Sequence, residues 1–365
     1  MRIGIVTQPL EMNYGGLLQN WALQQALRRL GHAPITIDAY ERYSMPHYLY
    51  NCMQAVFQSL RHGKKLIFPN RYRGSLRRPM TGKFVEEHIA KTHVMWDYQR
   101  SVVKRYHLDA LVVGSDQVWR AKYNGGHIED MYLRFAEGQP LRHRVAYAAS
   151  FGVDEWEYTA EQTAACARLA QQMDAVSVRE PSGVALCRDH LGVEAQCVLD
   201  PTMLLQAADY ENLIRDELAQ TKDQPHYLGV YCLDVTPEKR AFFERLASDR
   251  GLTVRYFAGG WFAAETVEQW LLMFSRASML VTDSFHGTVF SILFGKEFYT
   301  LGNPKRGNTR IMGLLEPLGL EKRLVSDTEP VEPADSYIDW DEVNARLAQK
   351  RQESLDFLVK SLREQ

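Results

Sequence analysis

Residues 278–294 read SMLVTDSFHGTVFSILF, and this stretch gives the strongest indication of the fold class. An apolar run typical of a β-strand ends just before Asp283, and a second apolar run stops at Gly295, a residue type at which helices commonly end. The polar residues between the two runs, which include Ser284 and His286, are therefore predicted to form a tight turn from strand to helix. In open α/β sheets the carboxyl ends of the strands face the ligand, and the N-terminus of a helix favours an anion there.

The same alternation of strand and helix continues through most of the chain, which predicts an α/β fold with parallel sheets. The expected strands are residues 2–7, 34–38, 109–113, 144–148, 175–178, 196–199, 227–231, 253–257, 278–282 and 297–301. The length of 365 residues indicates two domains rather than one. We expect two Rossmann-like domains that face each other across a cleft, at residues 1–205 and 206–340, followed by a C-terminal helix at 341–365.

The bulk properties of the chain exclude several classes of protein. Its hydrophobic content of 45% is typical of globular proteins, and its formal net charge of -2 gives no general attraction to nucleic acid. No apolar run is long enough to span a membrane, and the N-terminus is typical of a first strand rather than of a signal peptide. The five cysteines are widely spaced without a CxxC pair, which favours a cytoplasmic location and argues against structural zinc.

An insertion at residues 42–85 differs in composition from the rest of the chain. It contains nine Lys or Arg, no acidic residue, and interleaved aromatic residues. Residues 52–60 predict a short amphipathic helix within it. The basic part, residues 61–78, has two interpretations: a solvated basic loop, or a docking site for a pyrophosphate carrier or an anionic membrane surface. Docking would bring the protein to the inner face of the membrane.

His286 is the first candidate for chemistry, because a strand end, an acidic neighbour and a helix start coincide around it. The helix start favours the neutral imidazole and Asp283 favours the charged one, so we expect both forms to be accessible near neutral pH. This suits a general acid or base, with Asp283 as the orienting group. The alternative is that His286 only caps the helix.

Two arginines are candidates for binding an anion. Arg179 directly follows a predicted strand and suits bidentate binding of a carboxylate or phosphate. The alternative for Arg179 is a structural ion pair with Glu180. Arg310 ends a glycine-rich basic loop at residues 302–310, which is either a phosphate contact or a solvated loop.

Two further turns carry groups that suit hydroxyl ligands. Asn13, Gly15 and Gly16 form a tight turn before a predicted helix, while Ser115 and Asp116 follow a predicted strand. Neither turn has the GxGxxG spacing of a dinucleotide site, and the chain has no Walker A pattern. The sequence contains no metal-ligand cluster either, so we expect no metal and no cofactor.

Taken together, these pieces resemble the polysaccharide pyruvyl transferase family. The matching stretches follow the family's order and cover most of the chain: NYGGLLQ at 13–19, VGSDQVW at 113–119, SVRE at 177–180, VLDPT at 198–202 and TDSFHG at 282–287. The resemblance implies a fold like that of the GT-B glycosyltransferases. It also implies transfer from phosphoenolpyruvate to hydroxyls of a saccharide, which forms a pyruvate ketal in surface polysaccharide biosynthesis. Acceptors in the family are often built on lipid-linked carriers.

The resemblance also assigns roles to residues. The family's donor-site His and Arg correspond by motif to His286 and Arg179. The chain departs from the family at Ser284, where many members have Arg. Either Ser284 is used differently here, or Arg310 or Arg306 supplies the charge.

We therefore expect a donor site and an acceptor site. The donor site combines the catalytic residues His286, as the acid/base, and Asp283, as its orienting group, with Arg179, Arg310, Ser284 and Gly287. The acceptor site consists of Asn13, Tyr14, Gly15, Gly16, Ser115 and Asp116. Two other functions stay open: a GT-B-type glycosyltransferase that uses a nucleotide sugar, and a non-catalytic saccharide-binding protein.

Overall fold

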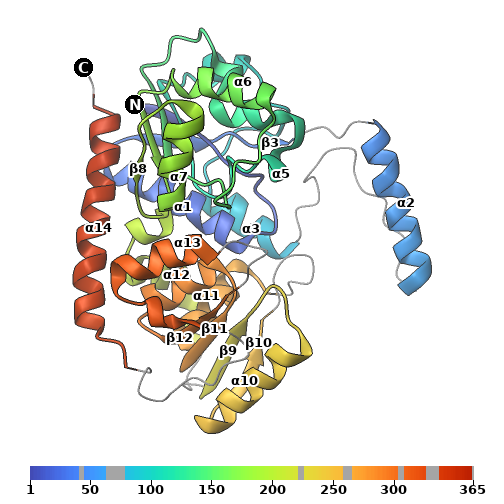
Figure 1. Cartoon of the computed structure of the whole chain (residues 1–365), viewed down its shortest axis with the longest axis vertical. Helices are drawn as coiled ribbons and strands as arrows, with labels where there is room; N and C mark the ends of the chain where they lie inside the picture. Colours follow the sequence, from blue (N-terminus) through green and yellow to red (C-terminus); the bar gives the residue numbers. More distant parts are fainter. Residues whose placement is uncertain are drawn as a thin grey trace.

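The body of the protein is built on two parallel β-sheets, which lie one above the other in Figure 1. This computed structural model describes residues 1–40, 45–62, 79–220, 226–257, 265–302, 308–325 and 337–363. The first sheet has the order β2-β1-β5-β6-β7-β8, with β1 (Arg2–Val6), β2 (Ala33–Thr36), β5 (Ala110–Val113), β6 (His143–Ala149), β7 (Ala175–Val178) and β8 (Gln196–Cys197). The second has the order β10-β9-β11-β12-β13, with β9 (Tyr227–Tyr231), β10 (Thr253–Tyr256), β11 (Met279–Thr282), β12 (Glu297–Leu301) and β13 (Leu324–Val325).

Both sheets follow one plan. In each, the chain first moves to one side (β1 to β2, β9 to β10) and then returns to the other side of the starting strand (β5, β11). Ligands bind at such reversals, outside the carboxyl ends of the strands. Strands β5 and β9 are buried along their whole length, as expected where helices cover both faces of a parallel sheet. The predicted α/β fold with parallel sheets is confirmed.

Helices connect and cover the strands, and several begin at a residue that caps the free N–H groups. Thr159, Thr236 and Thr266 each accept a hydrogen bond from a backbone N–H of the first helical turn. A two-stranded sheet of β3 (Ala39–Tyr40) and β4 (Met95–Trp96) flanks the first sheet. The helices are α1 (Tyr14–Arg29), α2 (Met45–His62), α3 (Pro79–His88), α4 (Ser101–Arg105), α5 (Ala121–Asn124), α6 (Ala160–Ala170), α7 (Pro181–Leu186), α8 (Ala207–Leu213), α9 (Arg215–Gln220), α10 (Pro237–Asp249), α11 (Val267–Arg276), α12 (Phe285–Leu293), α13 (Asn308–Leu315) and α14 (Trp340–Ser361).

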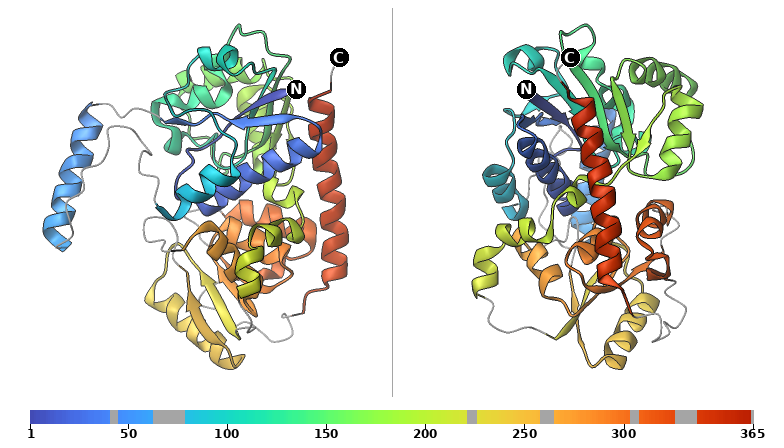
Figure 2. Two further views of the ribbon diagram at one scale, coloured as in Figure 1. Left: turned by 180° about the vertical axis from the view of Figure 1, so that it is seen from behind. Right: turned by 90° about the vertical axis from the view of Figure 1, so that its left-hand side faces the viewer.

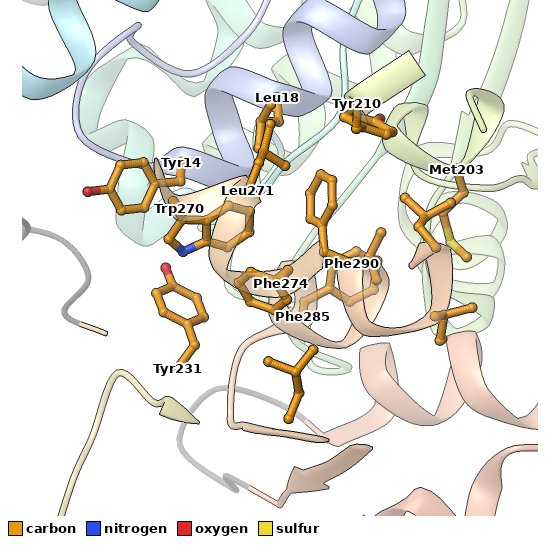
Figure 3. Packing of buried hydrophobic residues seen from close by; sticks show 14 of the residues in the cluster. Tyr14, Leu18, Met203, Tyr210, Tyr231, Trp270, Leu271, Phe274, Phe285 and Phe290 are labelled. Atoms are coloured by element: carbon orange, nitrogen blue, oxygen red, sulfur yellow. The ribbon is translucent and has the colours of Figure 1, made fainter. Parts of the chain in front are cut away.

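A shared aromatic core joins the two sheet units (Figure 3). Tyr14 of α1 stacks on Trp270 of α11 with ring centroids 5.6 Å apart, and its hydroxyl donates a hydrogen bond to the carbonyl of Glu265 at 2.6 Å. Phe274 and Phe290 pack on the same indole at 4.4 and 5.2 Å. Burial of apolar surface between the two units therefore holds them together, in addition to the connecting chain.

The C-terminal helix α14 runs along the side of both sheet units (Figure 2). Near its middle, Nε of Arg351 donates a hydrogen bond to the carbonyl of Met203 at 2.8 Å. Further along, the Ser354 hydroxyl accepts from the backbone N–H of Leu199 at 3.0 Å, and Phe357 packs near Tyr147 of β6. The last helix thus returns to the first sheet. The predicted C-terminal helix is present, and the domain boundary near residue 205 stays a prediction.

Helix α2 stands apart from both sheet units in Figures 1 and 2. It spans Met45–His62, so the helix predicted at residues 52–60 is longer than expected at both ends. The residues between 63 and 78, where most of the basic charge of the insertion lies, are outside the described part of the chain.

Candidate active site

Three strand ends of the first sheet deliver polar side chains to one place. Ser115 and Asp116 follow β5, Arg179 follows β7, and Asp200 follows β8. All four residues are buried. Because the carboxyl ends of parallel strands share one edge, side chains that are far apart in the sequence meet there.

The carboxylate of Asp200 is the centre of this cluster. Its Oδ2 accepts hydrogen bonds from the Ser115 hydroxyl at 3.0 Å and from Nη1 of Arg179 at 2.8 Å. Its Oδ1 accepts from the backbone N–H and the hydroxyl of Thr202, at 3.0 and 2.6 Å. Burial alone would raise the pKa of Asp200, but its interactions with His286, Arg179 and Thr202 outweigh burial and hold that pKa well below the ordinary value.

His286 reaches this carboxylate from the second sheet unit. It lies in the first turn of α12, directly after β11, and its Nε2 is 3.6 Å from Oδ2 of Asp200. Nε2 makes no hydrogen bond with the described residues. The other side of the ring lies against Gly15 of α1, where a Cβ would be only 2.1 Å from Nδ1. Position 15 therefore requires glycine, and the cluster is complete only when both units are in place.

A second carboxylate, Asp116, links the cluster to the start of α1. Its Oδ2 accepts a hydrogen bond from Nδ2 of Asn13 at 3.0 Å, while Oδ1 of Asn13 caps α1 by accepting from the N–H of Gly16. Oδ1 of Asp116 lies 3.9 Å from Nη2 of Arg179. The backbone of Asp116 has a φ of 76°, a left-handed conformation that is uncommon outside glycine and is found at functional sites.

Two arginines give this region its positive charge. Arg179 lies 4.3 Å over the ring of Phe285, and its Nε and Nη2 make no hydrogen bond with the described residues. Burial lowers the pKa of Arg179, but the charges of Asp200 and Asp116 outweigh it and raise that pKa. Burial and then the nearby charge of Arg179 lower the pKa of Arg310 to about 10. An anion bound beside both guanidinium groups would relieve the repulsion between their positive charges.

A model of the polysaccharide pyruvyl transferase family matches residues 13–305, which include the strand ends and His286 described above. The chain belongs to the polysaccharide pyruvyl transferase family. The resemblance expected from the sequence motifs is confirmed. Family membership implies a transferase that acts on polysaccharides, with a saccharide acceptor and a donor.

Solved structures similar to this pyruvyl transferase family member include a UDP-GlcNAc 2-epimerase from Methanocaldococcus jannaschii, at 12% identity over 95% of this chain and 92% of that chain, with a TM-score of 0.51. A UDP-GlcNAc 2-epimerase from Neisseria meningitidis, bound to UDP-GlcNAc, is 10% identical over 99% and 100% of the two chains, with a TM-score of 0.49. An alpha-glucosyltransferase in complex with UDP and DNA is 9% identical over 99% and 95%, with a TM-score of 0.45. The first likeness concerns the fold alone and agrees with the predicted GT-B-like architecture. A search of curated proteins gave no match.

Within this family member, Asp283 lies elsewhere than expected. Its Oδ1 accepts from the backbone N–H of Leu233 at 2.6 Å, and its Oδ2 accepts from Nζ of Lys239 at 3.1 Å. Asp283 therefore ties β11 to the loop after β9. The carboxylate beside His286 is that of Asp200 instead, so the expectation that Asp283 orients the imidazole is corrected.

Three further predicted residues, Ser284, Gly287 and Tyr14, have structural positions in the described part of the chain. Ser284 is the N-cap of α12, and Gly287 packs so closely on Thr282 that a Cβ there would lie 2.1 Å from its hydroxyl oxygen. Both shape the turn that carries His286. The side chain of Tyr14 is buried in the core between the units, where it stacks on Trp270, although its backbone begins α1. Arg306, the alternative to Arg310, lies outside the described residues.

Asp200 is the residue that reasoning from the sequence missed. It stands in the family stretch VLDPT, directly after a predicted strand. The pattern that indicated Arg179, a charged residue at the end of a strand, therefore also applies to Asp200. Arg179 also pairs with Asp200 rather than with Glu180, whose Oε1 accepts from the backbone N–H of Phe151 at 2.7 Å. In the part of the chain that the structure describes, no three His, Cys, Asp or Glu side chains gather into a metal site, and no helix is long and apolar enough to cross a bilayer.

Proposed function

We propose that the protein transfers the pyruvyl group of phosphoenolpyruvate to two hydroxyls of a saccharide, and that a cyclic ketal and inorganic phosphate are the products. The observation that carries this proposal is the buried group of Asp200, His286 and Arg179, assembled from both sheet units. Family membership supports the transfer chemistry. No cofactor takes part in the proposed reaction, because phosphoenolpyruvate is the donor substrate.

The donor binds to the arginines in this proposal. Phosphoenolpyruvate carries a carboxylate and a phosphate, and planar guanidinium groups suit both. Two nitrogens of Arg179, Nε and Nη2, make no hydrogen bond with the described residues, and the charge of Arg179 contributes to the lowered pKa of Arg310. Arg310 thereby takes over the role of the arginine that Ser284 replaces in this chain.

His286 moves the protons. The charged imidazole donates a proton to the methylene carbon of the donor, which becomes a methyl group and leaves a cationic centre at the neighbouring carbon. One acceptor hydroxyl attacks that carbon and loses its proton to the now neutral imidazole. The second hydroxyl then displaces the phosphate, which leaves with the second proton. Asp200 stays ionised throughout because its pKa is so low, and it stabilises the imidazolium that donates.

The acceptor binds on the side of the first sheet in this proposal. Asn13 and Asp116 supply amide and carboxylate groups there, and Ser115, Gly15 and Gly16 belong to the two turns that position them. These groups suit the hydroxyls of a sugar. A lipid-linked acceptor would bring the reaction to the inner face of the membrane, with the enzyme itself in the cytoplasm.

Thermal unfolding with phosphoenolpyruvate, followed by a phosphate-release assay with candidate saccharides, tests the proposal. We expect phosphoenolpyruvate to stabilise the wild type, and Arg179→Ala to abolish that stabilisation. His286→Gln should keep the stabilisation but lower turnover by about 10²-fold or more, because only the proton transfers are lost. Stabilisation by a nucleotide sugar and none by phosphoenolpyruvate would support the glycosyltransferase alternative. Normal turnover of His286→Gln would contradict the mechanism.

A further inference from the structure

Helix α2 exposes a row of large apolar side chains. Met45, Leu49, Met53 and Phe57 recur every four residues and therefore share one face of the helix. Their exposed fractions are 48%, 54%, 64% and 59%. Gln54 lies on a different face, where its side-chain amide donates a hydrogen bond to the Tyr50 hydroxyl. A contiguous apolar face of this kind is unusual on the surface of a globular protein and indicates that a binding partner covers it.

The charge of the surrounding chain indicates what that partner is. Residues 42–85 contain nine Lys or Arg and no Asp or Glu, and α2 itself has no acidic residue. The partner must therefore be apolar where it meets the helix and negatively charged beside it. An anionic lipid surface has both properties, since its acyl chains lie directly beneath charged head groups.

We infer that α2 docks on an anionic membrane surface, lying in the plane of the interface with the row Met45, Leu49, Met53 and Phe57 inserted. The helix has 18 residues, a length of about 27 Å along the surface. It does not span the bilayer. Tyr50, at the edge of the apolar face and 54% exposed, suits the boundary between acyl chains and head groups.

A second copy of the chain is the competing occupant of this face. Two copies joined through α2 would bring two acid-free basic segments together, and their like charges would repel each other. An anionic bilayer would instead neutralise the basic segment of each copy. The charge pattern therefore favours lipid. The inference does not depend on pyruvyl transfer, because it rests on α2 and the charge of its flanking sequence alone.

Co-sedimentation of the full-length protein with vesicles tests the inference. We compare vesicles of phosphatidylcholine alone with vesicles of phosphatidylcholine and phosphatidylglycerol. The wild type should bind the anionic vesicles, bind the neutral ones weakly, and lose binding in high salt. Met53→Glu and Phe57→Glu should each weaken binding about tenfold or more, because a charge replaces an inserted side chain.

Gln54→Glu is the matched control. It adds the same charge one residue away but off the apolar face, so it should weaken binding clearly less than Met53→Glu. All variants should keep the circular dichroism and melting temperature of the wild type, because the row is exposed. Equal losses in Gln54→Glu and Met53→Glu would overturn insertion of this face. Self-association that Met53→Glu abolishes, without vesicle binding by the wild type, would assign the face to a second copy.

Discussion

At the scale of single residues, Asp200 has the greatest influence on the site. It is 2% exposed, and it accepts hydrogen bonds from Ser115, Arg179 and Thr202 while facing His286. A buried guanidinium that loses its carboxylate is left without a compensating charge, and removing one partner of a buried ion pair strongly lowers the stability of the fold. The same carboxylate therefore stabilises the fold and lies beside the imidazole.

Asp200→Asn tests this double role. The amide keeps the shape but removes the charge, so we expect the free energy of unfolding to fall by about 3 kcal/mol in urea titrations. We also expect kcat to fall more than KM changes, because the imidazolium loses its stabilising charge. Thr202→Val is the control: it removes only the 2.6 Å bond of the hydroxyl and should cost about 1 kcal/mol with turnover retained. Equal effects of the two variants would contradict the role given to the charge.

The pH dependence of stability follows from the same group. The pKa of Asp200 is lowered in the folded protein, so the stability that its charge contributes is fully present above the unfolded pKa of about 4. That contribution is lost as the pH falls below this value toward the folded pKa. We expect wild-type unfolding free energy to fall steeply below about pH 4, and the Asp200→Asn curve to be flatter there. Parallel curves for the two proteins would show that another group controls acid unfolding.

Arg310→Met tests the second arginine of the donor site. Burial and the charge of Arg179 lower the pKa of Arg310 to about 10, so the guanidinium is still charged at neutral pH and can bind an anion. Removing this charge should abolish the stabilisation by phosphoenolpyruvate in thermal unfolding. Arg105→Met, at an exposed position of α4, should keep that stabilisation. Stabilisation by phosphoenolpyruvate that persists in Arg310→Met would contradict the role of Arg310 in binding the donor.

At the scale of elements, the contact between α1 and α12 sets the position of the imidazole. Gly15→Ala would place a Cβ 2.1 Å from Nδ1 of His286, so the ring must move. A misplacement of about 1 Å can lower turnover about 10²-fold, so we expect a loss of about that size in a turnover assay. Gly82→Ala in α3 is the control, because nothing lies within 4 Å of its added Cβ. Unchanged turnover in Gly15→Ala would show that the ring has room to shift without loss.

The strands and the turn around His286 could be predicted because each depends on local sequence. An apolar run, a glycine and a helix cap lie within a few residues of one another, and β7, β9 and β12 have the predicted bounds. Which carboxylate faces His286 depends instead on how the two units meet. Asp283 is close to His286 in sequence, but Lys239 and the loop after β9 hold it, while Asp200 arrives from the first sheet. No local pattern contains that information.

At the scale of the whole molecule, α14 holds the two units together from the outside. Phe357 is 8% exposed and packs near Tyr147 of β6, with ring centroids 6.2 Å apart. Phe357→Ala should lower the unfolding free energy by about 3 kcal/mol in calorimetry or urea titration. Gln352→Ala, on the exposed face of the same helix, should stay within about 0.5 kcal/mol of the wild type. A stable Phe357→Ala protein would show that α14 contributes little to the core.

The return of α14 to the first sheet also governs how the protein is made. A ribosome that has completed residues 1–339 has produced every strand of both sheets, yet Tyr147 and Leu199 still lack the helix that covers them. The first sheet, whose strands are synthesised before those of the second, is therefore covered completely only after the last helix has been made. Until then the nascent chain exposes the apolar surface that Phe357 and Leu358 later bury.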